Sequence, residues 1–172
     1  MLAWVLPAGC DSRPHAPQLS DTPVYQNKQA GFRFLVPDGW KQTMSAEIPP
    51  GPIEGEFFIV RYTLATLERG AALHVMCYEE ASHPELAQFH SEPSFSIQNW
   101  KATGAGESLT VNGVSYTRLS YLGGPQNQWM SKEVVGVVRG GRVYCFAAVF
   151  AASDDQAREQ VRRAIGSLKW DQ

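Results

Sequence analysis

The sequence lacks the features that mark several common protein classes. It has no apolar run of the 18 or more residues that a transmembrane helix needs. Its net charge of -2 and pI near 6.1 leave no excess of basic residues, which argues against binding to nucleic acid. Its three cysteines do not have the spacing of a zinc site. Membrane-spanning, nucleic-acid-binding and zinc-finger proteins are therefore all disfavoured.

Motifs that carry catalysis are also missing. The sequence contains no GxSxG elbow, no Gly-rich phosphate loop and no HExxH pair. Glu79 and Glu80 are neighbours at the end of a predicted strand, so their carboxylates face apart and do not form an acid-base pair. We therefore predict no catalytic residues and no cofactor, and an enzyme is the least favoured of the functional classes.

The histidines do not form a metal site either. His74 and Cys77 are three residues apart on a predicted strand and project to opposite faces. His83 and His90 are seven apart and would share a helix face, but no carboxylate accompanies them there. We expect solvated helix residues at these two positions and no bound metal.

What the sequence does contain is the composition of one globular domain. Of its 172 residues 44% are hydrophobic and 19% are charged, which is ordinary for a folded soluble protein. A chain of this length builds one well-buried core. We predict a single folded domain over residues 24–172.

The first ten residues, MLAWVLPAGC, are an apolar run that ends in Ala8, Gly9 and Cys10. This ending resembles the lipobox of bacterial lipoproteins, in which the signal is cut before a cysteine that is then acylated. The resemblance implies a signal segment over residues 1–9 and lipidation of Cys10. The alternative is an ordinary start with an unmodified cysteine, because the run carries no Lys or Arg and has Pro7 where a lipobox has Leu.

Residues 10–23 are rich in Pro, Ser and Asp and poor in apolar side chains. Such a segment buries too little surface to offset its ordering entropy. It is predicted to be a flexible tether.

Several segments have the alternating pattern of strands. GFRFLV places Phe32, Phe34 and Val36 on one face, and Pro37 with the turn residues Asp38-Gly39 ends the strand before Trp40 caps it. FFIVRYTL and AALHVMCY, residues 57–64 and 71–78, predict a hairpin.

Two dipeptides predict further antiparallel hairpins. Asn112-Gly113 and Gly140-Gly141 each separate two β-rich runs. The last run, RVYCFAAVF, is apolar on both faces, which indicates a strand inside the sheet that is covered on both sides.

Two helices are predicted to provide this cover. Ser82 with Glu85 forms a capping-box pattern that begins a helix near His83, which would run to about Gly104 with a break at Pro93. Ser153 with Gln156 forms a second capping box before an apolar stripe of Ala157, Val161, Ile165 and Leu168. The predicted fold class is α+β, a mainly antiparallel sheet with helices on both faces.

This order of elements, with Tyr25, GFRFLVPDGW and a closing SLKW, resembles the PsbP-like domain of DcrB-type and LpqN-type bacterial lipoproteins and of a small eukaryotic Ran-binding protein. The resemblance covers residues 24–170. It implies a structural role for the Trp40 segment and an α-β-α sandwich. Proteins with this fold bind different partners, so the fold does not select a function.

Aromatic side chains in the connections between predicted strands are the candidate binding residues. Trp129 and Met130 in the link GGPQNQWMSK, and Phe57 beside the turn PPGPIEGE, are candidate partner-binding residues, although Trp129 could instead pack on the sheet. Trp100 and Tyr116 are candidates for an apolar pocket between the sheet and the helix predicted over residues 83–104.

The two cysteines that remain after Cys10 form an even pair, so a Cys77–Cys145 disulfide is a candidate in an oxidising compartment. Bridging requires α-carbons within about 7 Å, which the sequence does not establish. Free buried thiols are the favoured state.

These patterns predict a non-catalytic lipoprotein domain of the bacterial cell envelope, monomeric and facing the periplasm or the exterior. It would bind an envelope protein and touch the membrane through its lipid anchor. The alternative is a small-ligand carrier with an apolar pocket.

Overall fold

The computed structural model describes residues 23–64, 70–82, 85–125 and 128–171. The signal segment, Cys10, nearly all of the tether and the predicted helix start at His83 lie outside these residues.

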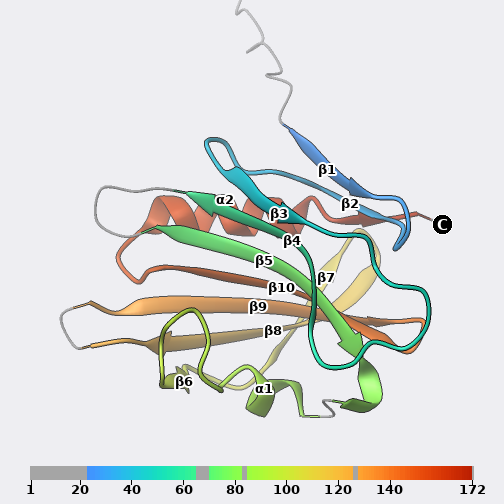
Figure 1. Ribbon diagram of the computed structural model, residues 1–172. Helices are drawn as coiled ribbons and strands as arrows, with labels where there is room; N and C mark the ends of the chain where they lie inside the picture. Colours follow the sequence, from blue (N-terminus) through green and yellow to red (C-terminus); the bar gives the residue numbers. More distant parts are fainter. Residues whose placement is uncertain (1–22, 65–69, 83–84, 126–127, 172) are drawn as a thin grey trace, which may run out of the picture.

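The described residues form two antiparallel sheets (Figure 1). The main sheet has the strand order β3-β4-β5-β10-β9-β8-β6, with β7 paired to β8, and the small sheet has the order β1-β2-β11. The strands are β1 (Val24–Asn27), β2 (Phe32–Leu35), β3 (Lys41–Ser45), β4 (Phe57–Leu64), β5 (Ala71–Glu79), β6 (Trp100–Ala102), β7 (Glu107–Val111), β8 (Val114–Gly123), β9 (Met130–Arg139), β10 (Arg142–Ala151) and β11 (Lys169–Trp170). The helical elements are the 3-10 turn η1 (Glu80–Ser82), α1 (Leu86–Phe89) and α2 (Asp155–Gly166).

The last strand lies where the sequence predicts. β10 pairs with β5 on one side and β9 on the other, so it is an inner strand of the main sheet. Its two faces enter two different hydrophobic clusters: Val143, Cys145, Ala147 and Val149 in one, and Tyr144, Phe146, Ala148 and Phe150 in the other. All eight residues are buried, which confirms a strand covered by protein on both faces.

One face of the main sheet is covered by α2 and the small sheet (Figure 1). Phe32 of β2 packs edge-on against Phe146 of β10, with ring centres 5.7 Å apart. Trp40 follows a turn in which Gly39 has φ of 79°, and its indole Nε1 donates to Gln160 Oε1 of α2 at 2.9 Å. Trp40 is therefore buried and hydrogen-bonded to α2, as its predicted capping role requires.

The opposite face is not covered by the predicted long helix. In the part of this segment that the structure describes, residues 85–104, helix is confined to Leu86–Phe89, with Glu85 at the N-cap and no side-chain capping bond. Phe95 and Ser96 have positive φ in a tight turn closed by Ser94 and Ile97, and Trp100 belongs to β6. The apolar positions of this segment still pack on the sheet, so their spacing reflects burial of an irregular chain rather than a helix. A substantial helix thus covers one face only of the described fold.

The other local predictions are largely confirmed. Asn112-Gly113 joins β7 to β8 and Gly140-Gly141 joins β9 to β10, and all four residues have positive φ. β4 and β5 pair antiparallel, although their link lies outside the described residues. The cap of α2 is Asp154, whose carboxylate accepts from Ala157 N at 2.9 Å, so the predicted capping box at Ser153 is wrong by one residue. No helix among the described residues is long and apolar enough to cross a membrane.

Candidate functional site

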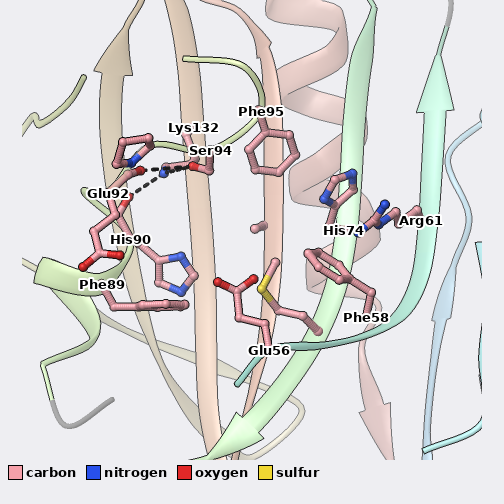
Figure 2. A pocket seen from close by; sticks show the side chains of 13 residues that line it. Glu56, Phe58, Arg61, His74, Phe89, His90, Glu92, Ser94, Phe95 and Lys132 are labelled. Carbon is pink, nitrogen blue, oxygen red and sulfur yellow. Dashed lines mark hydrogen bonds between the residues drawn. The ribbon is translucent and has the colours of Figure 1, made fainter. Parts of the chain in front are cut away.

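A pocket of about 340 Å³ opens on the sheet face opposite α2. Its floor comes from β4, β5, β9 and β10, and its wall comes from the irregular segment 89–95 (Figure 2). It is lined by Glu56, Phe58, Arg61, His74, Met76, Phe89, His90, Glu92, Pro93, Ser94, Phe95, Lys132 and Ala147.

A β-bulge in β4 brings two of these side chains together. Phe58 pairs with Met76 and Arg61 pairs with His74, with the register shifting between them. In a regular strand Phe58 and Arg61, three residues apart, would face opposite sides of the sheet. The extra residue places both on the pocket face, where the guanidinium carbon of Arg61 lies 3.8 Å from the centre of the Phe58 ring.

His74 completes an aromatic side of the pocket. Its ring centre lies 4.4 Å from that of Phe95 and 5.5 Å from that of Phe58. Burial, with a smaller contribution from the charge of Arg61, lowers the pKa of His74 to about 4. His74 is therefore neutral at pH 7.

Lys132 is almost completely buried on the other side of the pocket, at 1% exposure (Figure 2). Its Nζ donates to the carbonyl oxygen of His90 and, at 2.9 Å, to Ser94 Oγ. The same nitrogen lies 4.5 Å from the centre of the Trp100 ring and 5.1 Å from that of Tyr121. Burial lowers the pKa of Lys132 to about 8, and the charge of Glu56 acts in the opposite direction.

Arg61 has a hydrogen-bonding capacity that the fold does not use. Its Nε is buried and has no hydrogen-bond partner within the described residues. A buried donor of this kind is costly unless something accepts from it. The carboxylates of Glu56 and Glu92 are the acidic groups of the lining, and both residues are exposed.

The pocket does not coincide with the one predicted from the sequence. Trp100 is buried in the cluster on the pocket face, beneath Lys132, whereas Tyr116 is buried in the opposite cluster and accepts from Trp170 Nε1 at 2.7 Å. Tyr116 and Trp100 therefore lie on opposite faces of the sheet and cannot line one pocket. Apolar side chains between Leu86 and Ile97 pack on the sheet, but within residues 85–104 no long helix forms the pocket wall.

The candidate partner-binding residues differ in exposure. Trp129 is 41% exposed, whereas Met130 is 8% exposed at the start of β9 and Phe57 is partly buried against the core. Trp129 is therefore the member of this set that presents an aromatic surface to solvent.

The thiols of Cys77 and Cys145 are both buried and free. Cys77 belongs to the cluster beneath α2 and Cys145 to the cluster on the pocket face. Their side chains are on opposite sides of the sheet, so the candidate disulfide does not form.

The remaining titratable candidates are also separated. Glu79 pairs with Arg142 Nε at 3.2 Å and accepts from Ile53 N, while Glu80 is exposed in η1. His74 lines the pocket and Cys77 faces the other way, as expected from their spacing. The described residues contain no group of three His, Cys, Asp or Glu that could hold a metal ion.

Sequence reasoning missed the pocket, although one signal was present. Arg61 and His74 each interrupt a mainly apolar strand, and such interruptions can mark a polar site inside a sheet face, whereas Lys132 lies between Ser131 and Glu133 and gives no such signal. The bulge that places Arg61 beside Phe58 has no counterpart in the sequence pattern.

An antiparallel main sheet with a small sheet and one long helix on the same face is a PsbP-like α+β fold. The chain aligns with cyanobacterial PsbP (CyanoP) from Synechocystis sp. PCC 6803 over 91% of its length and 98% of that chain, at a TM-score of 0.62 and 14% identity. The fold resemblance seen in the sequence is thereby confirmed.

Two further solved structures share the fold. LpqN, involved in cell envelope biogenesis of Mycobacterium tuberculosis, aligns over 88% of this chain and 86% of its own at a TM-score of 0.53 and 11% identity. PA94 of Pseudomonas aeruginosa, a protein of unknown function, aligns over 87% of this chain and 97% of its own, at a TM-score of 0.51 and 13% identity. No protein-family profile matches the sequence, and neither does any curated protein.

Proposed function

We propose that this chain is a non-catalytic domain of the bacterial cell envelope that binds another envelope protein. The fold shared with LpqN, which is involved in cell envelope biogenesis, is the observation that carries the proposal. The lipobox-like ending at Cys10 supports export and attachment by a lipid. A non-catalytic role agrees with the state of Lys132, whose amine is buried and engaged with His90, Ser94 and two aromatic rings.

The proposed contact with the partner is Trp129. A large aromatic side chain on a fixed backbone is a common energetic centre of protein interfaces. The carbonyl of Trp129 accepts from Ala152 N at 2.9 Å, which ties the β8–β9 connection to the end of β10. This hydrogen bond restrains the backbone at Trp129, so the backbone loses little conformational entropy on binding.

The test is site-specific photo-crosslinking in native envelopes, comparing wild type with Trp129→Ala. The matched control is Val138→Ala, which removes another exposed apolar side chain, 52% exposed, near the far end of β9. Nine residues of strand separate the two sites by roughly 30 Å. A specific crosslinked band should be lost in Trp129→Ala and kept in Val138→Ala. Equal crosslinking of all three proteins would show that Trp129 is not the contact.

The proposed anchor is tested separately. Cys10→Ser should move the protein from the membrane fraction to the soluble fraction and abolish incorporation of labelled fatty acid. If wild type itself takes up no fatty acid, the anchor is wrong while the binding role can still stand on the crosslinking result.

A second candidate function is that of a small-ligand carrier. The pocket of about 340 Å³ beneath residues 89–95 favours it, because ligand sites in proteins commonly measure about 300–1,000 Å³.

A further inference from the structure

We propose that the pocket binds a small organic monocarboxylate with an apolar body, whose carboxylate accepts hydrogen bonds from Arg61. This inference rests on the second candidate function, since it names the class of ligand that such a carrier would hold. It is carried by the unused buried donor of Arg61 together with the shape and polarity of the pocket around it.

Arg61 is placed to recognise a planar anion. The guanidinium carbon of Arg61 lies 3.8 Å from the centre of the Phe58 ring, which restricts the orientation of the guanidinium. The phenyl ring has no oxygen or nitrogen that could accept a hydrogen bond from the Nε–H group of Arg61. A guanidinium presents its N–H donors in a rigid fork that matches a carboxylate. A ligand carboxylate would therefore satisfy a donor that the described residues leave without a partner.

The remaining groups favour a ligand with a single negative charge. Lys132 is cationic at pH 7, but its Nζ already donates to His90 and Ser94, and neutral His74 adds no further positive charge. The carboxylate of Glu56 lies in the middle of the lining and would repel a dianion such as phosphate more strongly than a monoanion (Figure 2). A monocarboxylate fits this balance better than a phosphate or a dicarboxylate does.

The walls indicate an apolar body. Phe58, Phe95 and the neutral ring of His74 form one side, and Met76 with Ala147 contributes to the lining near the sheet. A water molecule occupies about 30 Å³ in the liquid, and we assign the same volume to each non-hydrogen atom of a ligand. The pocket of about 340 Å³ then holds about eleven such atoms. A phenyl or short acyl body attached to a carboxylate has this size.

The experiment titrates the full isotope-labelled chain with 3-phenylpropionate and octanoate, following amide NMR shifts at Phe58, His74 and Phe95. The neutral isostere 3-phenyl-1-propanol and inorganic phosphate are titrated in parallel. We expect saturable shifts with both carboxylates, and affinity at least about tenfold lower for the alcohol, because a hydrogen bond to a charged group is lost.

Three variants locate the interaction. Arg61→Met keeps an unbranched side chain and should weaken 3-phenylpropionate binding about tenfold or more, whereas Arg61→Lys, which keeps the charge without the fork, should lie between it and wild type. Arg118→Met is the matched control, because Arg118 pairs with Glu107 on the exposed β7–β8 hairpin and should leave the affinity unchanged. Circular dichroism verifies that each variant is folded, and Arg61→Lys keeps the test decisive if Arg61→Met does not fold.

The possible outcomes separate two claims, the carrier function and the recognition of a carboxylate by Arg61. Equal binding of the alcohol and the acid, or equal affinity in Arg61→Lys and wild type, would keep a carrier function but overturn recognition of a carboxylate by Arg61. Phosphate that produces the same shifts as 3-phenylpropionate would show that the pocket senses charge alone, which also overturns the inference. Absence of saturable shifts with every probe up to ~10 mM would overturn both the inference and the carrier function.

Discussion

The ammonium nitrogen of Lys132 lies 4.5 Å from the centre of the Trp100 ring, on the sheet face that carries the pocket. The same nitrogen donates to His90 and to Ser94, both in the irregular segment that walls the pocket. One side chain of an inner strand thus connects the sheet to this segment at two points, His90 and Ser94. A buried charge is tolerated when it is hydrogen-bonded and contacts aromatic faces in this way.

Lys132→Ala should therefore lower the free energy of unfolding by about 2–4 kcal/mol, because it leaves a cavity and removes the donor from two acceptors. Lys132→Met fills most of the volume and removes the cost of desolvating the charge, so its loss should be less than half as large. Urea unfolding followed by tryptophan fluorescence measures both. Lys101→Ala, at an exposed position of β6, is the control and should change stability by no more than about 0.5 kcal/mol. A Lys132→Ala protein as stable as this control would show that the connection has no energetic importance.

Stability should fall in mild acid because of His74. Burial, then the charge of Arg61, lowers the pKa of this ring from 6.5 to about 4, so between these pH values the folded protein holds fewer protons than the unfolded chain does. The stability due to the neutral ring is complete above pH 6.5 and is lost as the pH falls toward 4. Because the ring of His74 is partly exposed, solvent screening reduces its effect. We expect His74 to lower the free energy of unfolding by about 1–2 kcal/mol between pH 7 and pH 4.5, which is well below the value of the full pKa shift.

His74→Gln and His74→Phe do not titrate, so each should lose less stability than wild type between pH 7 and pH 4.5. The phenyl ring of the second variant also retains an aromatic contact with Phe95. Denaturant unfolding of the three proteins at the two pH values gives the comparison. Parallel losses in all three would mean that other groups, and not His74, set the acid sensitivity.

The sequence alone was sufficient to predict strands and hairpins where turn chemistry and side-chain burial favour the same structure. The two-faced apolar pattern of RVYCFAAVF correctly predicted that β10 is an inner strand, and Asn112-Gly113 and Gly140-Gly141 correctly predicted two hairpins. These features are readable because turn chemistry and side-chain alternation are properties of the segment itself.

The sequence was insufficient where tertiary contacts decide. The apolar residues between Leu86 and Trp100 have helical spacing, but their burial is achieved by a four-residue helix, a tight turn at Phe95 and Ser96, and strand β6. Whether β1, β2 and β11 join the main sheet or form a second one depends on pairing between distant segments. The pocket was missed for a similar reason, since it depends on the bulge between Phe58 and Arg61.

Gly123 is required by the packing of β8 against β6. A β-carbon there would lie 2.7 Å from the backbone oxygen of Asn99 and 2.7 Å from Cε3 of the Trp100 ring. Gly123→Ala should therefore destabilise the protein by about 2–3 kcal/mol through overpacking against backbone. Gly166→Ala is the matched control, because nothing lies within 4 Å of the added carbon at the end of α2, and it should stabilise by about 0.5 kcal/mol through helix propensity. Thermal unfolding should show Tm changes of opposite sign, and a neutral Gly123→Ala would mean that β6 moves away from β8 at little cost.

The thiols of Cys77 and Cys145 should be unreactive in the folded protein. Burial raises the pKa of Cys77 to about 11 and that of Cys145 to about 12, so almost no thiolate exists at pH 8, and both side chains are inaccessible to a reagent. In a Cys10→Ser chain, Ellman's reagent should detect no thiol at pH 8 before unfolding and both thiols in guanidinium chloride. Prolonged exposure of the folded chain to oxidised glutathione should leave the pair unbridged, because the sheet separates the two sulfur atoms. Rapid reaction of one thiol without denaturant would show that its strand opens locally, and a bridged product would contradict the placement of the two side chains on opposite faces.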